Sequence, residues 1–376
     1  MTVLLPSNPI LIIAQSARML ANAAKQAGYR PLVIDLFGDQ DTTAIAEQFW
    51  RVDDLSLVSI RDIIPVVLSK YNVATLVYGS GMENQPETLA YLAQSFKILG
   101  NSPATCQQLN DKISFFKQLG KLSIRYPEVR FSLPQDKTGW LIKPRKNIGG
   151  LGISHCDRVA TEDEYYQRFY TGQSGSVLFC SDGLNFDLIG WQRQWSRSAE
   201  DFSFSGIIRD CILPLEAQQE VLLWLTKLVA EYKLKGLASL DFIWNGQYCY
   251  LLEINPRPPA SMMLYPELDL FTAHNTGRLR DENSVIPESN LSFDSIAASE
   301  KQWNKSIYAL QIVYARQGCC IPKNIKWPEW SCDHPHIVGN IPANVPICSI
   351  IAQEKTVQLT LDSLLVRQQF IENNLY

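Results

Sequence analysis

Several patterns that mark common protein classes are missing from this chain of 376 residues. It has only four histidines and no C-x-x-C pair among its nine cysteines, which argues against a histidine-based hydrolase and a zinc ribbon. It has no extended Lys/Arg-rich run, and its net charge is −4, so a nucleic-acid surface is not indicated. Its apolar stretches are too short to span a bilayer, and no leader-like pattern precedes the first of them. We therefore expect a cytoplasmic protein that binds neither nucleic acid nor membranes.

Two further kinds of site are only partly represented. The cluster Cys332-x-His334-x-His336 has a spacing that fits no zinc pattern, so reduced and mostly buried thiols are the favoured interpretation. The Gly-Ser-Gly turn at residues 79–81 follows a strand-like run but lacks the full G-x-G-x-x-G of dinucleotide-binding proteins. A dehydrogenase is therefore disfavoured, and a tight turn with a nearby carboxylate explains this segment at least as well.

What the chain does contain is the composition of a globular protein, with 46% apolar and 19% charged residues and enough length for two or three domains. Residues 10–14 and 29–36 have the pattern of buried strands on either side of an alanine-rich helix over 16–28. Another strand is expected over 73–78, followed by a helix over 86–99. This β-α-β order predicts a parallel sheet. We assign residues 1–108 to an N-terminal Rossmann-like α/β domain.

A predicted β-hairpin over residues 240–259, LDFIWNGQYCYLLEINPRPP, carries the strongest chemical signal. Its Asn-Gly pair predicts the turn, and its prolines end the second strand. Glu253 and Asn255 are two residues apart and therefore leave the same face of the strand, while Asp241 is expected across from them. Two carboxylates and an amide oxygen, with Arg257 just beyond, form a hard-oxygen site suited to Mg²⁺ on a polyphosphate. The alternative is a set of solvated acidic residues near strand ends.

A lysine followed by a glycine-rich loop precedes this hairpin by about a hundred residues. The apolar run over 140–143 predicts a strand that ends in Lys143, and the loop after it contains Gly149, Gly150 and Gly152. Glycines let backbone N–H groups approach phosphate oxygens closely, and the lysine supplies positive charge. The motif is not a P-loop, because the lysine precedes the glycines. A simple hairpin with a glycine turn remains open.

Two other basic residues are candidates for binding anions. Asn110 or Asp111 is expected to cap a helix whose first turn contains Lys112, although this lysine, taken alone, is more typical of a surface residue. Arg18, in the segment Ser16-Ala17-Arg18 after the first strand, is a candidate for holding a substrate anion.

The rest of the chain predicts a mixed α+β architecture that ends in a β-rich segment. We expect a helix over 162–169, strands over 176–180 and 186–195, a helix over 215–235, a surface excursion over 279–300, short strands over 308–315, 336–341 and 345–352, and a terminal helix over 361–374. We place domain boundaries so that residues 109–300 form a central two-lobed domain and residues 301–376 a C-terminal segment packed on it.

Taken together, these motifs resemble the ATP-grasp superfamily, and the resemblance covers nearly the whole chain. It comprises the N-terminal α/β domain, Asn110-Asp111-Lys112, Lys143-Pro144 with its glycine-rich loop, and Asp241 followed by Glu253-Ile-Asn255-Pro-Arg257. Within the superfamily, the chain is most similar to predicted ATP-dependent carboligases related to biotin carboxylase. The fold that this resemblance implies is ATP-grasp, with α/β and α+β parts and nucleotide held between two lobes.

The resemblance also implies roles for single residues. Lys112 and Lys143 would contact ATP phosphates under the lid formed by Gly149, Gly150 and Gly152. Asp241, Glu253 and Asn255 would hold Mg²⁺, or Mn²⁺ in its place, and Arg257 would act with Lys143 in catalysis by steadying an acyl phosphate or a substrate carboxylate. Gln167 stands where family members usually carry an acidic residue near the adenosine, so the contacts to the base are not specified.

The function implied is that of an ATP-dependent ligase that joins a small-molecule carboxylate to an amine through an acyl phosphate. A place in one-carbon or pterin-type cofactor biosynthesis and a homodimeric state are further expectations from the family. Two alternatives remain: carboxylation through carboxyphosphate, as in biotin carboxylase, and a nucleotide-binding protein without turnover.

Overall fold

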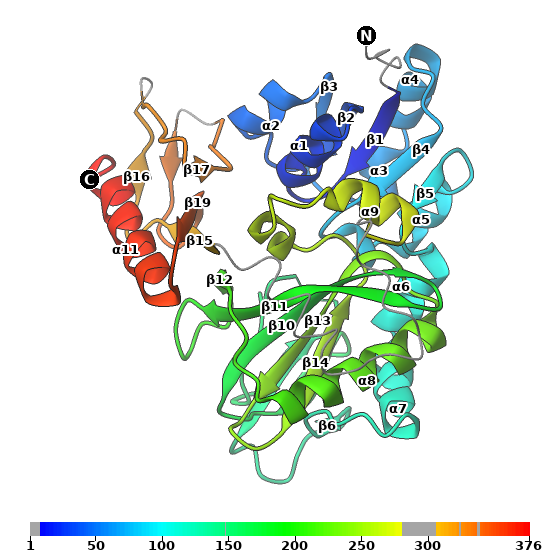
Figure 1. Cartoon of the computed structure of the whole chain (residues 1–376), viewed down its shortest axis with the longest axis vertical. Coiled ribbons are helices and arrows are strands. Elements are labelled where there is room, and N and C mark those ends of the chain that lie inside the picture. Colours follow the sequence, from blue (N-terminus) through cyan, green and yellow to red (C-terminus); the bar gives the residue numbers. More distant parts are fainter. Residues whose placement is uncertain (1–7, 147, 280–305, 323–324, 337–338) are drawn as a thin grey trace.

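The computed structural model describes residues 8–146, 148–279, 306–322, 325–336 and 339–376 (Figure 1). The N-terminal part is a parallel sheet of order β3-β2-β1-β4-β5, as the β-α-β pattern predicted. Its strands are β1 (Pro9–Ile13), β2 (Arg30–Asp35), β3 (Gln48–Arg51), β4 (Thr75–Tyr78) and β5 (Lys97–Leu99). Every residue of β1 is buried, because helices cover both faces of a parallel sheet.

The helices around this sheet alternate with its strands along the chain. They are α1 (Arg18–Gln26), α2 (Gln40–Ile45), α3 (Leu57–Ile60), α4 (Ile63–Lys70), η1 (Met82–Asn84), α5 (Pro86–Leu92) and α6 (Pro103–Asn110). The carboxyl ends of β1, β2 and β4 all lie at one edge of the sheet, since the strands run parallel. This edge therefore collects the loops that follow Ile13, Asp35 and Tyr78.

The central part of the chain contains a small antiparallel sheet and most of a large one. The small sheet has the order β6-β9-β7-β8, and the large one has the order β14-β13-β10-β11-β12-β15-β19-β17. The elements here are α7 (Lys112–Lys121), β6 (Val129–Arg130), β7 (Trp140–Pro144), β8 (Ser154–His155), β9 (Glu164–Arg168), β10 (Gln173–Asp182), β11 (Phe186–Ser196), β12 (Phe204–Arg209), α8 (Leu215–Tyr232), β13 (Lys235–Trp244), β14 (Cys249–Asn255), η2 (Ala260–Leu264) and α9 (Leu270–Thr276).

Three of the C-terminal strands continue the large sheet, because β12 pairs with β15, whereas the other two, β16 and β18, form a separate two-stranded sheet. The elements are β15 (Ile307–Tyr314), β16 (Cys319–Cys320), β17 (Ser331–Cys332), β18 (Asn340–Ile341), β19 (Pro346–Glu354) and α11 (Val357–Asn373). The terminal helix α11 lies against β15 and β19, at the opposite end of the fold from α7 (Figure 1). The surface excursion expected over 279–300 lies outside the described residues from 280 onward.

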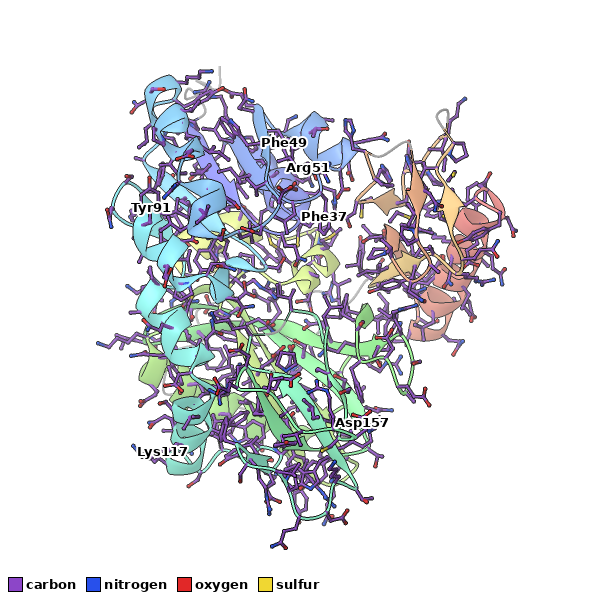
Figure 2. The ribbon with its side chains drawn as sticks, turned by 180° about the vertical axis from the view of Figure 1, so that it is seen from behind. Phe37, Phe49, Arg51, Tyr91, Lys117 and Asp157 are labelled. Carbon is purple, nitrogen blue, oxygen red and sulfur yellow. The ribbon has the colours of Figure 1, made fainter. Side chains whose placement is uncertain are left out.

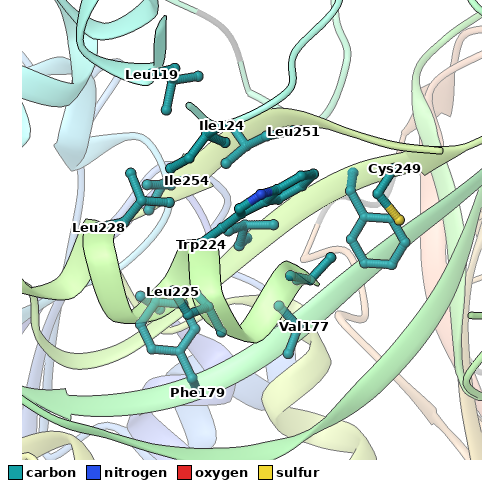
Figure 3. Close-up of a cluster of buried hydrophobic side chains, with 14 of the residues drawn as sticks. Leu119, Ile124, Val177, Phe179, Trp224, Leu225, Leu228, Cys249, Leu251 and Ile254 are labelled. Atoms are coloured by element: carbon teal, nitrogen blue, oxygen red, sulfur yellow. The ribbon is translucent and has the colours of Figure 1, made fainter. Parts of the chain in front are cut away.

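A core between α8 and the large sheet fixes the predicted hairpin. Trp224, Leu225 and Leu228 of α8 face Val177 of β10 and Leu251 of β14 (Figure 3). The helix forms as the apolar spacing predicted, and Lys233 in the left-handed region ends it. This packing holds β13 and β14 from the side opposite their polar residues.

Two predicted elements are wrong in type. Residues 162–169 were expected to be helical, but β9 pairs there with both β6 and β7, and its Tyr165, Tyr166 and Gln167 are all buried. Aromatic residues favour this position because they pack well on a pleated surface. The helix expected from Pro86 to Leu99 ends at Leu92, and β5 then extends the parallel sheet beside β4.

Candidate active site

The polar face of the β13–β14 hairpin assembles as predicted. Asp241 pairs directly with Glu253, and Ser239 pairs with Asn255 two residues further along the strands. Asn255 Nδ2 donates a hydrogen bond to Asp241 Oδ2 (3.1 Å), and Ser176 Oγ on β10 donates to Asp241 Oδ1 (2.7 Å). Burial, and then the neighbouring Glu253 carboxylate, raise the pKa of Asp241 to about 6. Two carboxylates thus crowd one site, and a bound cation would relieve their repulsion.

Lys143 lies across from these carboxylates at the end of β7. Its side chain is 7% exposed, and its ammonium group donates a hydrogen bond to Gln167 Oε1 on β9 (3.1 Å). Burial lowers the pKa of Lys143, while the negative charges of Glu253 and Asp241 oppose this effect. The buried lysine therefore lies close enough to the two carboxylates of the hairpin for their charges to act on it.

Lys112, in the first turn of α7, also lies near the Glu253 carboxylate. Burial lowers its pKa, and the carboxylates of Glu253 and Glu83 counteract that effect. The side chain of Asp111 caps the helix by accepting a hydrogen bond from Ser114 N (3.2 Å), which confirms the predicted start. The positive charge of Lys112 also lowers the pKa of Lys143, so the two ammonium groups repel each other. A polyanion between them would relieve that repulsion.

The glycine-rich loop contacts two other parts of the fold. Phe204 N donates a hydrogen bond to Gly149 O (2.8 Å). Gly150 has φ +76°, and a Cβ atom there would lie 2.1 Å from Phe202 O, so only glycine fits. On the other side, a Cβ at Gly81 would lie 3.6 Å from Ile148 Cδ1. The loop therefore lies between β12 and the N-terminal sheet edge.

Glu83 is a site residue that the sequence alone did not identify. It follows the Gly-Ser-Gly turn after β4, is 5% exposed, and forms an ion pair with Arg257 (Oε1 to Nε, 2.8 Å). Arg257 also donates a hydrogen bond to Asn255 Oδ1 (3.2 Å). Burial tends to lower the pKa of Arg257, but Glu83, Asp241 and Glu253 outweigh it and raise that pKa. The only signal in the sequence was a carboxylate beside a tight turn.

The backbone between Asn255 and Arg257 is also held by the N-terminal part of the chain. The Tyr78 hydroxyl and Asn101 Nδ2 each donate a hydrogen bond to Pro256 O, at 3.1 Å in both cases. The Asn255–Arg257 segment is thus fixed from outside its own sheet.

Arg18 does not lie free to bind a substrate anion. Its side chain pairs with Asp333 (Nε to Oδ1, 2.5 Å) and donates to Met263 Sδ (3.1 Å). The neighbouring His334 ring stacks on Trp327 with 4.7 Å between ring centroids. Within the part of the chain that the structure describes, no three His, Cys, Asp or Glu side chains are arranged to hold a metal ion, and this holds for the 332–336 cluster.

Comparison with known proteins identifies the domain that carries this site. Residues 109–261 match the sequence model of the family described as ATP-grasp domain. Over 92% of its length, the chain is 17% identical to an uncharacterized protein of Methanocaldococcus jannaschii, of which the match covers 88%.

Solved structures share the fold at low sequence identity. The biotin carboxylase domain of Hydrogenobacter thermophilus 2-oxoglutarate carboxylase, a dimer in complex with MgADP, ADP and bicarbonate, has a TM-score of 0.69 at 12% identity, covering 94% of this chain and 88% of that one. The L-amino acid ligase of Bacillus licheniformis has a TM-score of 0.66 at 12% identity, covering 99% and 98%. The chain spans 36% of a Rhizobium etli pyruvate carboxylase that it matches (TM-score 0.68, 12% identity, 96% of this chain). Among the described residues, no helix has the length and apolar character needed to cross a membrane.

Proposed function

Because the chain contains an ATP-grasp domain, we propose that it is an ATP-dependent ligase that joins a small-molecule carboxylate to an amine through an acyl phosphate. The observation that carries this proposal is that Lys112 and Lys143 both lie near the Glu253 carboxylate, which pairs with Asp241. Such an arrangement suits a triphosphate with its counter-cation better than it suits any neutral ligand.

The residues present fit a divalent cation. Asp241, Glu253 and the Asn255 amide oxygen are hard-oxygen donors, which Mg²⁺ prefers and Mn²⁺ accepts. When bound, the ion would neutralise phosphate charge. Asn255 Oδ1 accepts a hydrogen bond from Arg257, so the same amide oxygen that would hold the ion also contacts the guanidinium.

The positive side chains then have distinct tasks. Transfer of a phosphoryl group to a carboxylate brings together negative charge from the acid and the nucleotide, and Lys143 and Lys112 offset that charge. Arg257, held in place by Glu83, is positioned to bind the acid or its acyl phosphate. The loop at Gly149, Gly150 and Gly152 would exclude water, which would otherwise hydrolyse the intermediate. Gln167 accepts a hydrogen bond from the Lys143 ammonium group, so we assign it to positioning Lys143 rather than to recognising the nucleotide base.

Release of ADP and phosphate tests this proposal. We would screen the twenty amino acids, dicarboxylic acids and pteroate as acids, the last because the family is linked to pterin-type cofactors. Ammonium chloride, ethanolamine and putrescine would serve as amines, with Mg²⁺ or Mn²⁺. We expect release that needs both an acid and an amine. Lys143→Ala and Glu253→Gln should each lower it by roughly 10²–10³-fold.

A matched control comes from α7. Lys117 is exposed and labelled in Figure 2, so Lys117→Ala removes the same charge away from the site and should leave turnover unchanged. Near-normal turnover in the Lys143 and Glu253 variants would refute the proposal. ADP release with bicarbonate and no organic acid would favour carboxylation instead, and nucleotide-induced stabilisation without turnover would favour a binding protein. Light scattering on the same preparation tests the expected homodimer.

A further inference from the structure

A row of polar side chains crosses the large sheet at the level of the candidate site. The residues that pair directly from strand to strand, from β12 through β11, β10 and β13 to β14, are Arg209, Gln192, Ser176, Asp241 and Glu253. Residues directly opposite each other on paired strands point to the same face of a sheet. Their neighbours Val177 and Trp191 face the α8 core on the other side. The row therefore continues the carboxylate pair toward β12, over strands that lie side by side in Figure 1.

Gln192 has only one half of its amide in use. It is 1% exposed, and its Nε2 atom donates hydrogen bonds to Gly190 O (2.8 Å) and to the Tyr265 hydroxyl (2.6 Å). The Gly190 carbonyl can only accept, so the reverse orientation of the amide would set two acceptors against each other. Gln192 Oε1 is buried and, among the residues that the structure describes, has no donor. A buried acceptor without a donor indicates a ligand or an ordered water.

The row also fixes where Gln192 lies relative to the reaction. β10 separates β11 from β13, so Gln192 and Asp241 are two strands apart, about 10 Å at the usual strand spacing. Gln192 is therefore too far from Asp241 to coordinate the same ion, whose ligands lie within about 2 Å. It is close enough to contact a small molecule that extends from the ion toward β12.

The segment from Arg257 to Tyr265 crosses the same face of the sheet. At its start Arg257 donates a hydrogen bond to Asn255 on β14, and at its end the Tyr265 hydroxyl accepts one from Gln192 on β11. Ser261 stands in the middle of this segment and is 2% exposed. Its Oγ atom is buried and has no hydrogen-bond partner within the described part of the chain. The segment thus carries a second polar group whose bonding is incomplete.

The chemistry of these two atoms selects an N–H donor without charge. An amide oxygen can only accept, and a serine hydroxyl can accept as well. Neither atom carries a charge, and burial disfavours the charged form of an amine. A neutral primary amine fits this pair, because it has two N–H donors and keeps its lone pair free for attack. A carboxylate in place of Gln192 would instead hold the nitrogen as an unreactive ammonium ion.

We propose that Gln192, together with Ser261, binds the amine substrate as a neutral primary amine or as ammonia, an inference that rests on the ligase function proposed above. In the step concerned, the amine nitrogen forms a bond to the acyl carbon, and the bond from that carbon to the phosphate oxygen breaks. The bonding electron pair leaves with the phosphate, which also takes the proton that the nitrogen loses. Gln192 and Ser261 orient the nitrogen and do not take its proton.

Binding of methoxyamine tests this site without any need for turnover, because its NH₂ group is uncharged at neutral pH. We would measure its dissociation constant by ligand-observed NMR with Mg²⁺ and ADP present. Gln192→Met keeps the length of the side chain and removes the acceptor, so we expect binding to weaken roughly three- to tenfold. Gln173→Met makes the same change at an exposed glutamine of β10 and should leave binding unchanged. N,O-Dimethylhydroxylamine, with a single N–H, should bind wild type more weakly than methoxyamine.

Ser261→Ala gives a readout that a structural serine would not. Its Oγ atom makes no bond within the described fold, so the variant should keep or raise the Tm while weakening methoxyamine binding. This variant also carries the test if Gln192→Met fails to fold. A lowered Tm with unchanged binding would overturn the role of Ser261.

Two results would overturn the proposal as a whole. They are equal methoxyamine affinity in wild type, Gln192→Met and Ser261→Ala, and no methoxyamine binding by wild type, either of which would assign the two atoms to ordered water. Acid- and amine-dependent ADP release that is unchanged in both variants would overturn it while leaving the ligase function intact. Wild-type ADP release that needs an acid but no amine would instead refute the amine ligase itself.

Discussion

Replacing Glu83 with alanine tests how much the ion pair with Arg257 contributes to stability, separately from the role of Arg257 in turnover. The ion pair between them is short (2.8 Å), and its side chains are only 7% and 11% exposed. Removing one partner of a buried pair strands the other charge and typically costs about 3–5 kcal/mol. Arg257 would keep its hydrogen bond to Asn255 Oδ1, so we expect the lower end, about 3 kcal/mol of unfolding free energy.

The assay is denaturant unfolding followed by tryptophan fluorescence, with Glu128→Ala as the matched control. Glu128 pairs with Arg130 at a similar distance, 2.7 Å, but those side chains are 52% and 44% exposed. An exposed pair contributes at most about 1 kcal/mol, because water screens it. The double variant Glu83→Ala/Arg257→Met should recover most of the lost stability, since the unpaired charge is gone.

Turnover should not recover along with stability in the double variant. The double variant regains stability but lacks the guanidinium, so its turnover should stay at least as low as that of Glu83→Ala. If Glu83→Ala costs no more than Glu128→Ala, the pair is not a buried anchor and our account of Arg257 is wrong. If the double variant is less stable than the single one, the stranded charge is not the cause of the loss.

Two other predictions use neighbouring parts of the fold. Gly150→Ala should lower ATP affinity at least about tenfold, because its Cβ would meet Phe202 O. The control Gly28→Ala also has a positive φ (+85°) but open space around it, so it should cost only about 1–2 kcal/mol of stability and leave ATP affinity unchanged. Burial lowers the pKa of His274 to about 4 from an ordinary 6.5, so the unfolded chain binds more protons between these values and acid destabilises the fold. Between pH 6.5 and 4, wild type should lose up to about 3 kcal/mol more than His274→Gln in urea titrations, and equal losses would contradict this assignment.

The hairpin was predictable because its information is local. Asn245 and Gly246 specify the turn, and its length sets the register as far as the pair Phe242 and Leu251. A β-bulge at the next step, which the turn does not specify, then places Asp241 opposite Glu253. The long helix α8 was predictable for the same reason, since its apolar spacing and its end are both encoded within a few turns. The prediction for residues 164–168 was wrong because a short segment with two tyrosines fits either a helix or a strand. Only its pairing with β6 and β7 makes it a strand.

The contacts of Arg18 and Glu83 could not be predicted from the sequence. Arg18 lies after a parallel strand, where an anion site is expected, but its partner Asp333 is 315 residues away. Glu83 and Arg257 are 174 residues apart, and nothing in either segment specifies the other. Local patterns give the type of a residue and its face, whereas partners at this separation depend on how the sheets are placed.

Contacts between distant segments also decide which parts of the chain form the candidate site. The ATP-grasp match covers residues 109–261, but Tyr78, Asn101 and Glu83 lie outside it and hold the Asn255–Arg257 segment through Pro256 O and the Arg257 guanidinium. Their hydrogen bonds and ion pair fix the part of the chain that directly follows β14. The N-terminal sheet therefore fixes the position of Arg257. In the ligase that we propose, changes at this sheet edge would alter how Arg257 meets the acid substrate.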